Sequence, residues 1–252
     1  MLSFRLARPG QEIKSSDLVL CHTWPVGKRQ ETRDRIEGQI VELGRRHLIT
    51  EGAAGLSLRA IARDLGMVSS AVYRYVASRD DLLTLLLVDA YSELADAVDA
   101  ARQPAGGSWR DQLMAMARAA RNWAVDQPAS WALLYGSPVP GYHAPREQTV
   151  GPGTRVVAAL FDAIAAGIAA GDIPKTNIAA PQPLSSDFGR VRDEFGFPGD
   201  DAAVAKCFLL WAGLVGAISL EVFGQYGADT LTDPSMVFDT QMRLLVVMLT
   251  GA

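Results

Sequence analysis

The sequence has few of the residues on which metal sites and disulfide frameworks depend. Its 252 residues include two cysteines and three histidines. Cys21 and Cys207 are far apart and neither belongs to a C-x-x-C pair, so no disulfide framework or zinc knuckle is indicated. His22, His47 and His143 have no His or Cys at metal-ligand spacing. The sequence therefore predicts neither a metal site nor a bound cofactor.

A long uncharged apolar run is also missing. The longest, from Cys207 to Leu220, is too short to span a bilayer and is closed by Lys206 and Glu221. The first 27 residues contain no continuous apolar segment of the kind that a secretory signal needs. We expect a cytoplasmic protein that does not bind a membrane.

Familiar catalytic motifs are absent as well. The sequence contains no G-x-S-x-G elbow and no P-loop. Gly151 and Gly153 begin a G-x-G pattern, but no strand precedes it and no third glycine completes it. These absences argue against an enzyme, although an all-α enzyme stays open as an alternative for the second half of the chain.

Helical periodicity is present over most of the sequence. Hydrophobic residues make up 49% of the chain, and no run alternates with period two for long enough to form a strand. Helices are predicted over residues 31–52, 58–65, 69–75, 78–103, 109–126, 129–135, 154–170, 200–225 and 235–250. Loops are predicted over residues 136–153 and 171–199. We therefore expect an all-α protein.

Charge divides the chain unevenly. Residues 28–80 hold ten Lys or Arg against seven Asp or Glu, whereas residues 81–252 hold eleven against nineteen. A basic head on an acidic body is typical of a small DNA-reading unit joined to a larger one. We predict a disordered arm over 1–28, a helix-turn-helix domain over 29–80, and a helical regulatory and dimerisation domain over 81–252.

The segment 58–75 has the pattern of two short helices that cross at a tight turn. Ala62 is small where the second helix would cross the first, and Gly66 can adopt the positive φ that the turn requires. The shared apolar core is expected from Ile61, Leu65, Met67, Val72 and Tyr75. An ordinary helical hairpin, the alternative, would seldom meet these demands together.

The outer face of the second of these helices is polar. With Val72 inward, it presents Ser69, Ser70, Tyr73 and Arg74. Short hydroxyls let a helix approach base edges, Arg74 can reach a guanine or a phosphate, and the Tyr73 hydroxyl can bind a phosphate oxygen. These residue types predict a surface that reads DNA.

Three further residues are assigned to DNA binding. Ser57, at the start of the first short helix, offers a hydroxyl and free backbone N–H groups to a phosphate, and Arg79, at the start of the long helix, is expected to hold the DNA backbone from the other side. Tyr75 is included in this set, with core packing as an equal alternative.

The stretch 55–83 closely resembles the DNA-binding domain of TetR-family regulators, and the resemblance extends over about residues 33–87. It includes the Leu-Gly turn, the Ala-x-Tyr-Arg-Tyr segment at 71–75 and the Ser-Arg-Asp-Asp-Leu-Leu start of the long helix at 78–83. The family usually has a hydroxyl residue where Val68 stands, so Ser69 is expected to cap the helix instead. It usually has Phe where Val76 stands, which predicts looser packing.

The second half resembles the family less closely. Residues 209–221 resemble a subgroup with a Trp-x-Gly motif, here Trp211 and Gly213. The resemblance implies a homodimer formed through the last two long helices, residues 200–225 and 235–250. Small residues that permit close approach are Gly213, Gly216, Ala217 and Gly224, and an apolar stripe consists of Met242, Leu245, Val246 and Leu249. This stripe could instead face the chain's own core.

A pocket for a small-molecule effector is also implied by the resemblance. Its candidate lining residues are Trp123, Trp131, Tyr135, Phe161 and Trp211, although an aromatic at helical spacing is more often part of the core. His143 is a candidate polar contact. We expect a sequence-specific DNA-binding transcriptional regulator, a repressor that an effector releases from a pseudo-palindromic operator. A DNA-binding protein without an effector is the alternative.

Overall fold

The computed structural model describes residues 26–103, 107–176 and 178–251, and over these residues the chain contains helices and no strand. The helices are α1 (Val26–Gly55), α2 (Leu58–Asp64), α3 (Ser69–Val72), α4 (Arg79–Arg102), α5 (Trp109–Asp126), α6 (Pro128–Tyr135), α7 (Arg146–Ala169), α8 (Leu184–Phe195), α9 (Asp201–Val222) and α10 (Pro234–Thr250). The expected all-α fold is confirmed.

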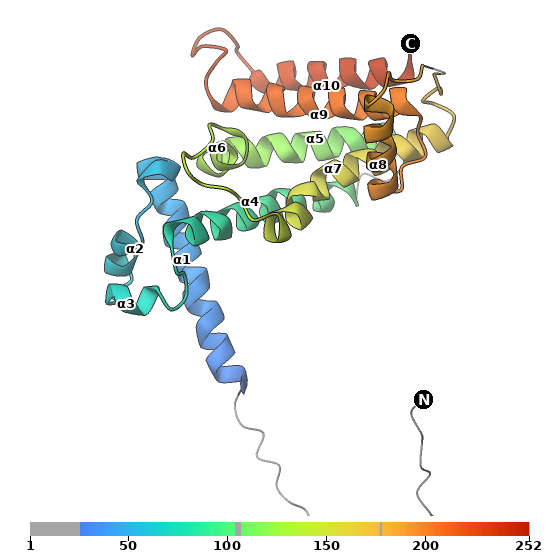
Figure 1. The fold of residues 1–252 in the computed structure, drawn as a ribbon. Coiled ribbons are helices and arrows are strands. Elements are labelled where there is room, and N and C mark those ends of the chain that lie inside the picture. The colour runs from blue at the N-terminus through green and yellow to red at the C-terminus, as the bar shows by residue number, and fades with distance from the viewer. Residues whose placement is uncertain (1–25, 104–106, 177, 252) are drawn as a thin grey trace, which may run out of the picture.

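The helices form a small head and a larger body (Figure 1). Helices α1, α2 and α3 form the head at one end of the molecule, and α9 and α10 lie side by side along an opposite edge of the body. Helices α4, α5 and α7 run between the two. The predicted helices 58–65, 200–225 and 235–250 agree with α2, α9 and α10 to within three residues.

Two predicted loops contain helix. Helix α8 occupies the middle of 171–199, and α7 begins at Arg146, inside 136–153, with Pro152 within the helix. The Gly and Pro content of both segments lowers their intrinsic helix propensity and predicts loops. Tertiary packing outweighs this propensity here. Phe188 of α8 is buried in the body core, and a Cβ on Gly153 of α7 would lie 3.4 Å from the Tyr91 ring of α4, so α7 packs closely on α4.

The start of α1 also differs from the prediction. Residues 26–28 belong to α1 and not to an arm, while the rest of the expected arm lies outside the described residues. The predicted stop at Gly52 is a kink, since this residue has φ 67° and ψ 174°, and one more helical turn follows to Gly55. A glycine adopts this backbone conformation without a steric penalty.

Two apolar cores lie along the molecule, and α4 contributes to both. Leu82, Leu83 and Leu86 belong to the head core, whereas Leu94 and Val98 belong to the body core. Because α4 is a single helix, the head is attached to the body by a rigid element and not by a flexible linker.

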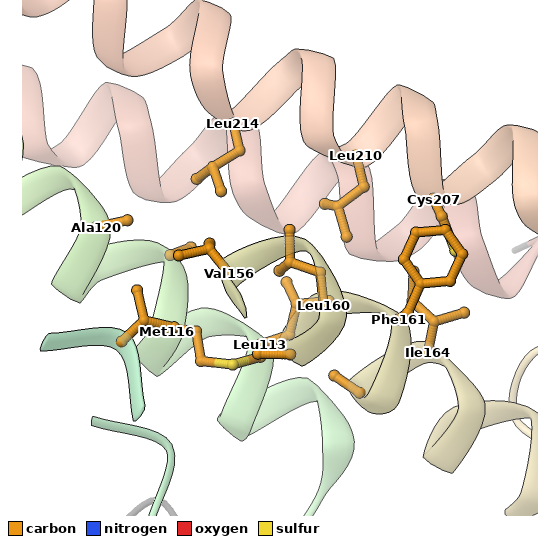
Figure 2. Packing of buried hydrophobic residues seen from close by; sticks show 14 of the residues in the cluster. Leu113, Met116, Ala120, Val156, Leu160, Phe161, Ile164, Cys207, Leu210 and Leu214 are labelled. Carbon is orange, nitrogen blue, oxygen red and sulfur yellow. The ribbon is translucent and has the colours of Figure 1, made fainter. Parts of the chain in front are cut away.

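The body core is built mainly by α5, α7 and α9 (Figure 2). Side chains such as Leu113 of α5, Leu160 and Phe161 of α7, and Leu210 of α9 point toward one another and are almost completely buried. Cys207 is buried here as a free thiol, and this burial raises its pKa to about 12. It serves as a small apolar core residue.

The edge formed by α9 and α10 is unusually apolar on its outer side. Three residues of the expected stripe, Met242, Val246 and Leu249, are buried in the chain's own core. The exposed apolar row beside them consists of Leu209, Leu220, Met236, Leu244 and Val247, whereas Phe208, also exposed, stacks on Phe188 of α8. Between the two helices, Gly213, Gly216 and Leu244 line a shallow groove of about 460 Å³.

Helices α7 and α9 are long and apolar enough to cross a membrane, judged by length and composition alone. In each, 39% of the apolar segment is buried inside the fold. Both helices are apolar because they pack in the body core. Helix α9 is also apolar on the outer edge that it forms with α10.

A mostly buried ion pair joins α5 to α9. Arg121 binds Glu221 through two hydrogen bonds, one of them 2.7 Å from Nε to Oε2, and the two side chains are 14% and 13% exposed. Glu221→Gln leaves the Arg121 charge without its partner in a poorly solvated site. We expect it to lower the free energy of unfolding by about 3 kcal/mol, measured by urea denaturation of the full chain.

Glu194→Gln is the matched control, because Glu194 is exposed on α8. A surface substitution of this kind changes stability by about 0.5 kcal/mol or less. If the two variants lose the same stability, the Arg121–Glu221 pair does not hold α5 against α9.

Candidate nucleic-acid interface and effector cleft

The turn between α2 and α3 is built as the sequence predicts. Ile61 and Ala62 are buried under the crossing, and Gly66 has φ 66°. The amide of Met67 donates to the carbonyl of Ala62 over 2.9 Å. Ser57 is the N-cap of α2, where its hydroxyl accepts a hydrogen bond of 3.4 Å from the Ala60 amide.

Helix α3 is shorter than predicted and has no side-chain cap. It begins at Ser69 with Val68 at the N-cap, so the expectation that Ser69 caps the helix is wrong. Regular α-helix ends at Val72, and the chain continues in turns to Tyr75, whose amide donates to the Val72 carbonyl. The Ser69 hydroxyl is therefore not used for capping.

The outer face of α3 carries the expected polar residues. Ser70 and Arg74 are exposed, Tyr73 is 43% exposed and Ser69 is half-buried, whereas Ala71 and Val72 beneath them are buried. Tyr75 packs partly against the head core, with the Arg33 guanidinium 5.9 Å from its ring centroid. The face that can meet DNA is thus formed chiefly by Ser69, Ser70, Tyr73 and Arg74.

Arg79 has partners within the head. Its Nη2 donates to the carbonyl oxygen of Ala53 at 2.8 Å and to that of Ala54 at 3.2 Å, at the end of α1. The Ser78 hydroxyl caps α4 by accepting from the Asp81 amide. Arg79 therefore joins the end of α1 to the start of α4, next to α3.

Two exposed residues of the head were not assigned to DNA binding from the sequence. Arg59, in the first turn of α2, is exposed and has no hydrogen bond or ion pair within the part of the chain that the structure describes. Val68, at the start of α3, is 71% exposed. Helical spacing could have found Arg59, since Leu58, Ile61 and Ala62 occupy the buried face of α2.

The candidate aromatic residues divide into separate groups. Trp131, Tyr135 and Trp211 are in contact, with ring centroids 4.3 Å apart for the first pair and 5.9 Å for Tyr135 and Trp211. Phe161 belongs to another group, because it packs against Phe195 and Phe197 in the body core. Trp123 packs against the body core as well, and His143 is exposed.

Tyr135 is the candidate that lines an open cleft. This cleft has a volume of about 900 Å³ and separates the end of α1 from α6 and the loop after it. Its walls include Leu48, Glu51 and Ala53 of α1, Ala132 and Tyr135 of α6, and Phe223 after α9. Burial raises the pKa of the Tyr135 phenol, which therefore stays neutral.

Comparison with known proteins identifies this arrangement. Residues 113–245, more than half of the chain, match the family model described as the C-terminal domain of tetracycline-repressor-like proteins. The HTH-type transcriptional regulator Rv1816 of Mycobacterium tuberculosis is 71% identical over 231 residues, which cover 91% of this chain and 99% of that protein. The chain belongs to the TetR family. It is a DNA-binding transcriptional regulator with a helix-turn-helix head.

Solved structures support the same assignment. The regulatory protein SCO4313 is 31% identical, with a TM-score of 0.70 over 86% of this chain and 98% of that one. FadR from Bacillus subtilis, solved with stearoyl-CoA, has a TM-score of 0.62 at 11% identity, over 85% of this chain and 98% of FadR. That second likeness shows the fold alone.

These findings give the enzyme alternative no support, because the family consists of transcription regulators. Among the residues that the structure describes, no group of three or more His, Cys, Asp or Glu side chains could hold a metal ion. The sequence motif of Trp211 and Gly213 predicts that the chain belongs to the Trp-x-Gly subgroup of the family. This assignment stays a prediction.

The exposed guanidinium of Arg74 gives a direct test of the regulator's DNA face. Arg74→Ala should weaken binding to operator DNA by about 1–3 kcal/mol if the side chain contacts a base, measured by fluorescence anisotropy. Arg190→Ala is the control, since it also removes one exposed positive charge but lies on α8, far from the head. Equal affinity of the two folded variants would remove Arg74 from the DNA contacts.

Proposed function

We propose that the regulator is a homodimeric repressor that acts in the cytoplasm and leaves its operator when a small-molecule effector binds. The observation that carries the DNA-binding part is the exposed α3 face of Ser70, Tyr73 and Arg74 above the buried pair Ala71 and Val72. Each of the two heads places this face in a major groove, one helical turn apart on a pseudo-palindromic operator.

The roles of the head residues follow from their chemistry. Arg74 binds guanine or a phosphate, the hydroxyls of Ser69 and Ser70 bind base edges, and Tyr73 binds a phosphate. Arg59 and Ser57 at the start of α2 face the phosphate backbone. Val68 presents methyl groups at the start of α3, where the complementary group in DNA is the methyl of thymine. Arg79 holds the DNA backbone from the side of α4 while it bonds the end of α1, and Tyr75, which packs partly in the head core, supports the α3 face.

Dimerisation is supported by the outer edge of α9 and α10. Its exposed apolar row would be costly in water and is suited to an identical row on a second copy. In the groove, the buried side-chain oxygen of Gln241 has no hydrogen-bond partner within the described chain.

The experiment that tests this function is fluorescence anisotropy of the full chain with labelled DNA from upstream of its own gene. We expect tight binding that weakens steeply with salt and that survives an excess of unrelated DNA, because specific base contacts add to the phosphate contacts. Binding that the competitor abolishes would contradict a specific operator at this locus. No binding by the folded dimer at low salt would contradict the proposed function.

The dimer has its own test at Leu244, which is 65% exposed on α10. Leu244→Glu places a charge in the apolar row and should convert the dimer to a monomer, measured by sedimentation velocity. Operator affinity should then fall by about 100-fold or more, since the two heads no longer bind as one unit. Val125→Glu, at an exposed valine of α5, should change neither measurement. A Leu244→Glu protein that stays dimeric would place the dimer interface elsewhere.

A further inference from the structure

The cleft between head and body has the size and lining of a ligand site. Its volume of about 900 Å³ lies within the range of small-molecule pockets, roughly 300–1,000 Å³. Most of its lining is apolar, with Leu48, Ala132 and Leu133 among the walls, and Tyr135 and Phe223 add aromatic rings. Phe223 is 40% exposed, so part of its ring is open to the cleft.

The lining of the cleft carries one charge, and the Arg79 guanidinium, which bonds the carbonyls of the lining residues Ala53 and Ala54, is not part of that lining. Glu51 is the one charged side chain in its lining, where Lys, Arg and His are absent. Glu51 has no hydrogen bond or ion pair among the residues that the structure describes. Glu51 is exposed at the edge of this mostly apolar cleft, and a carboxylate there attracts a cation and repels an anion.

We propose that this cleft binds a hydrophobic organic cation, with the charged group of the ligand at Glu51 and its apolar body between Tyr135 and Phe223. The site is distinct from the interior of the body, where Phe161 and its neighbours are closely packed. An acyl-CoA, which FadR from Bacillus subtilis binds in its solved structure, is polyanionic and does not fit this charge.

The position of the cleft gives the ligand a way to act on DNA binding, and this step rests on the proposed function. One wall is the end of α1, whose Ala53 and Ala54 carbonyls hold Arg79 at the start of α4, next to α3. The other wall includes Leu133 and Val139, which also pack against the head core. A ligand between these walls alters how the head rests on the body, and hence the spacing of the two reading faces in a dimer.

The test uses two probe ions of matched shape and opposite charge, tetraphenylphosphonium and tetraphenylborate. Their affinities for the full-length dimer without DNA are measured by isothermal titration calorimetry. We expect the cation to bind at least tenfold more tightly than the anion. Glu51→Gln keeps the size of the side chain and removes its charge, so it should weaken cation binding roughly tenfold. Glu194→Gln, at an exposed carboxylate of α8, should leave it unchanged.

The location is tested by filling the cleft. Ala132→Trp should abolish cation binding, whereas Ala166→Trp, at an exposed alanine of α7, should not. Equal or tighter binding of the borate, or a cation affinity that neither Glu51→Gln nor Ala132→Trp lowers, would overturn the proposed site.

Anisotropy with operator DNA separates this inference from the proposed function. Phosphonium that weakens operator binding by the wild type but not by Ala132→Trp supports both. Specific DNA binding by a chain that does not bind the phosphonium overturns the cation site and leaves the regulator intact. Cation binding in the cleft by a chain that binds no DNA supports the site and contradicts the proposed function.

Discussion

The arrangement of the molecule depends on the packing of α4, which contributes apolar side chains to two cores. Leu82, Leu83 and Leu86 fix its first half in the head, and Leu94 and Val98 fix its second half in the body. Because the helix between them is continuous, a change in how the head packs would reach the body as a rotation or shift of a rigid rod. No separate hinge is required for the two parts to influence each other.

A second connection runs from α6 through the loop that follows it. Leu133, Val139 and Tyr142 pack against the head core, and the Tyr142 hydroxyl lies 2.9 Å from that of Thr84 on α4. The head therefore rests on both α4 and α6, with the cleft beside this contact. A ligand there would compete with the contact itself, so modest differences in affinity between two arrangements would suffice to change DNA binding.

The exposed face of α3 belongs to a helix that is very short and is held in place by its surroundings. Helix α3 has only one regular turn, too short to be stable alone. Buried Ala71 and Val72, the turn at Gly66 and the bonds of Arg79 to the end of α1 fix its position. The side chains on its outer face are therefore not needed to hold the helix in place, which leaves them available for the proposed contacts with DNA.

Local pattern in the sequence was sufficient for the all-α fold, the helix-turn-helix and the polar face of α3, because helical periodicity, caps and a turn glycine act over a few residues. It did not reveal α8, the early start of α7 or the burial of Met242 and Val246, since those depend on which distant side chains fill the same space. Local pattern also could not predict that Tyr135, Glu51 and Phe223 line one cleft. These residues are far apart in sequence, and only tertiary packing brings them together.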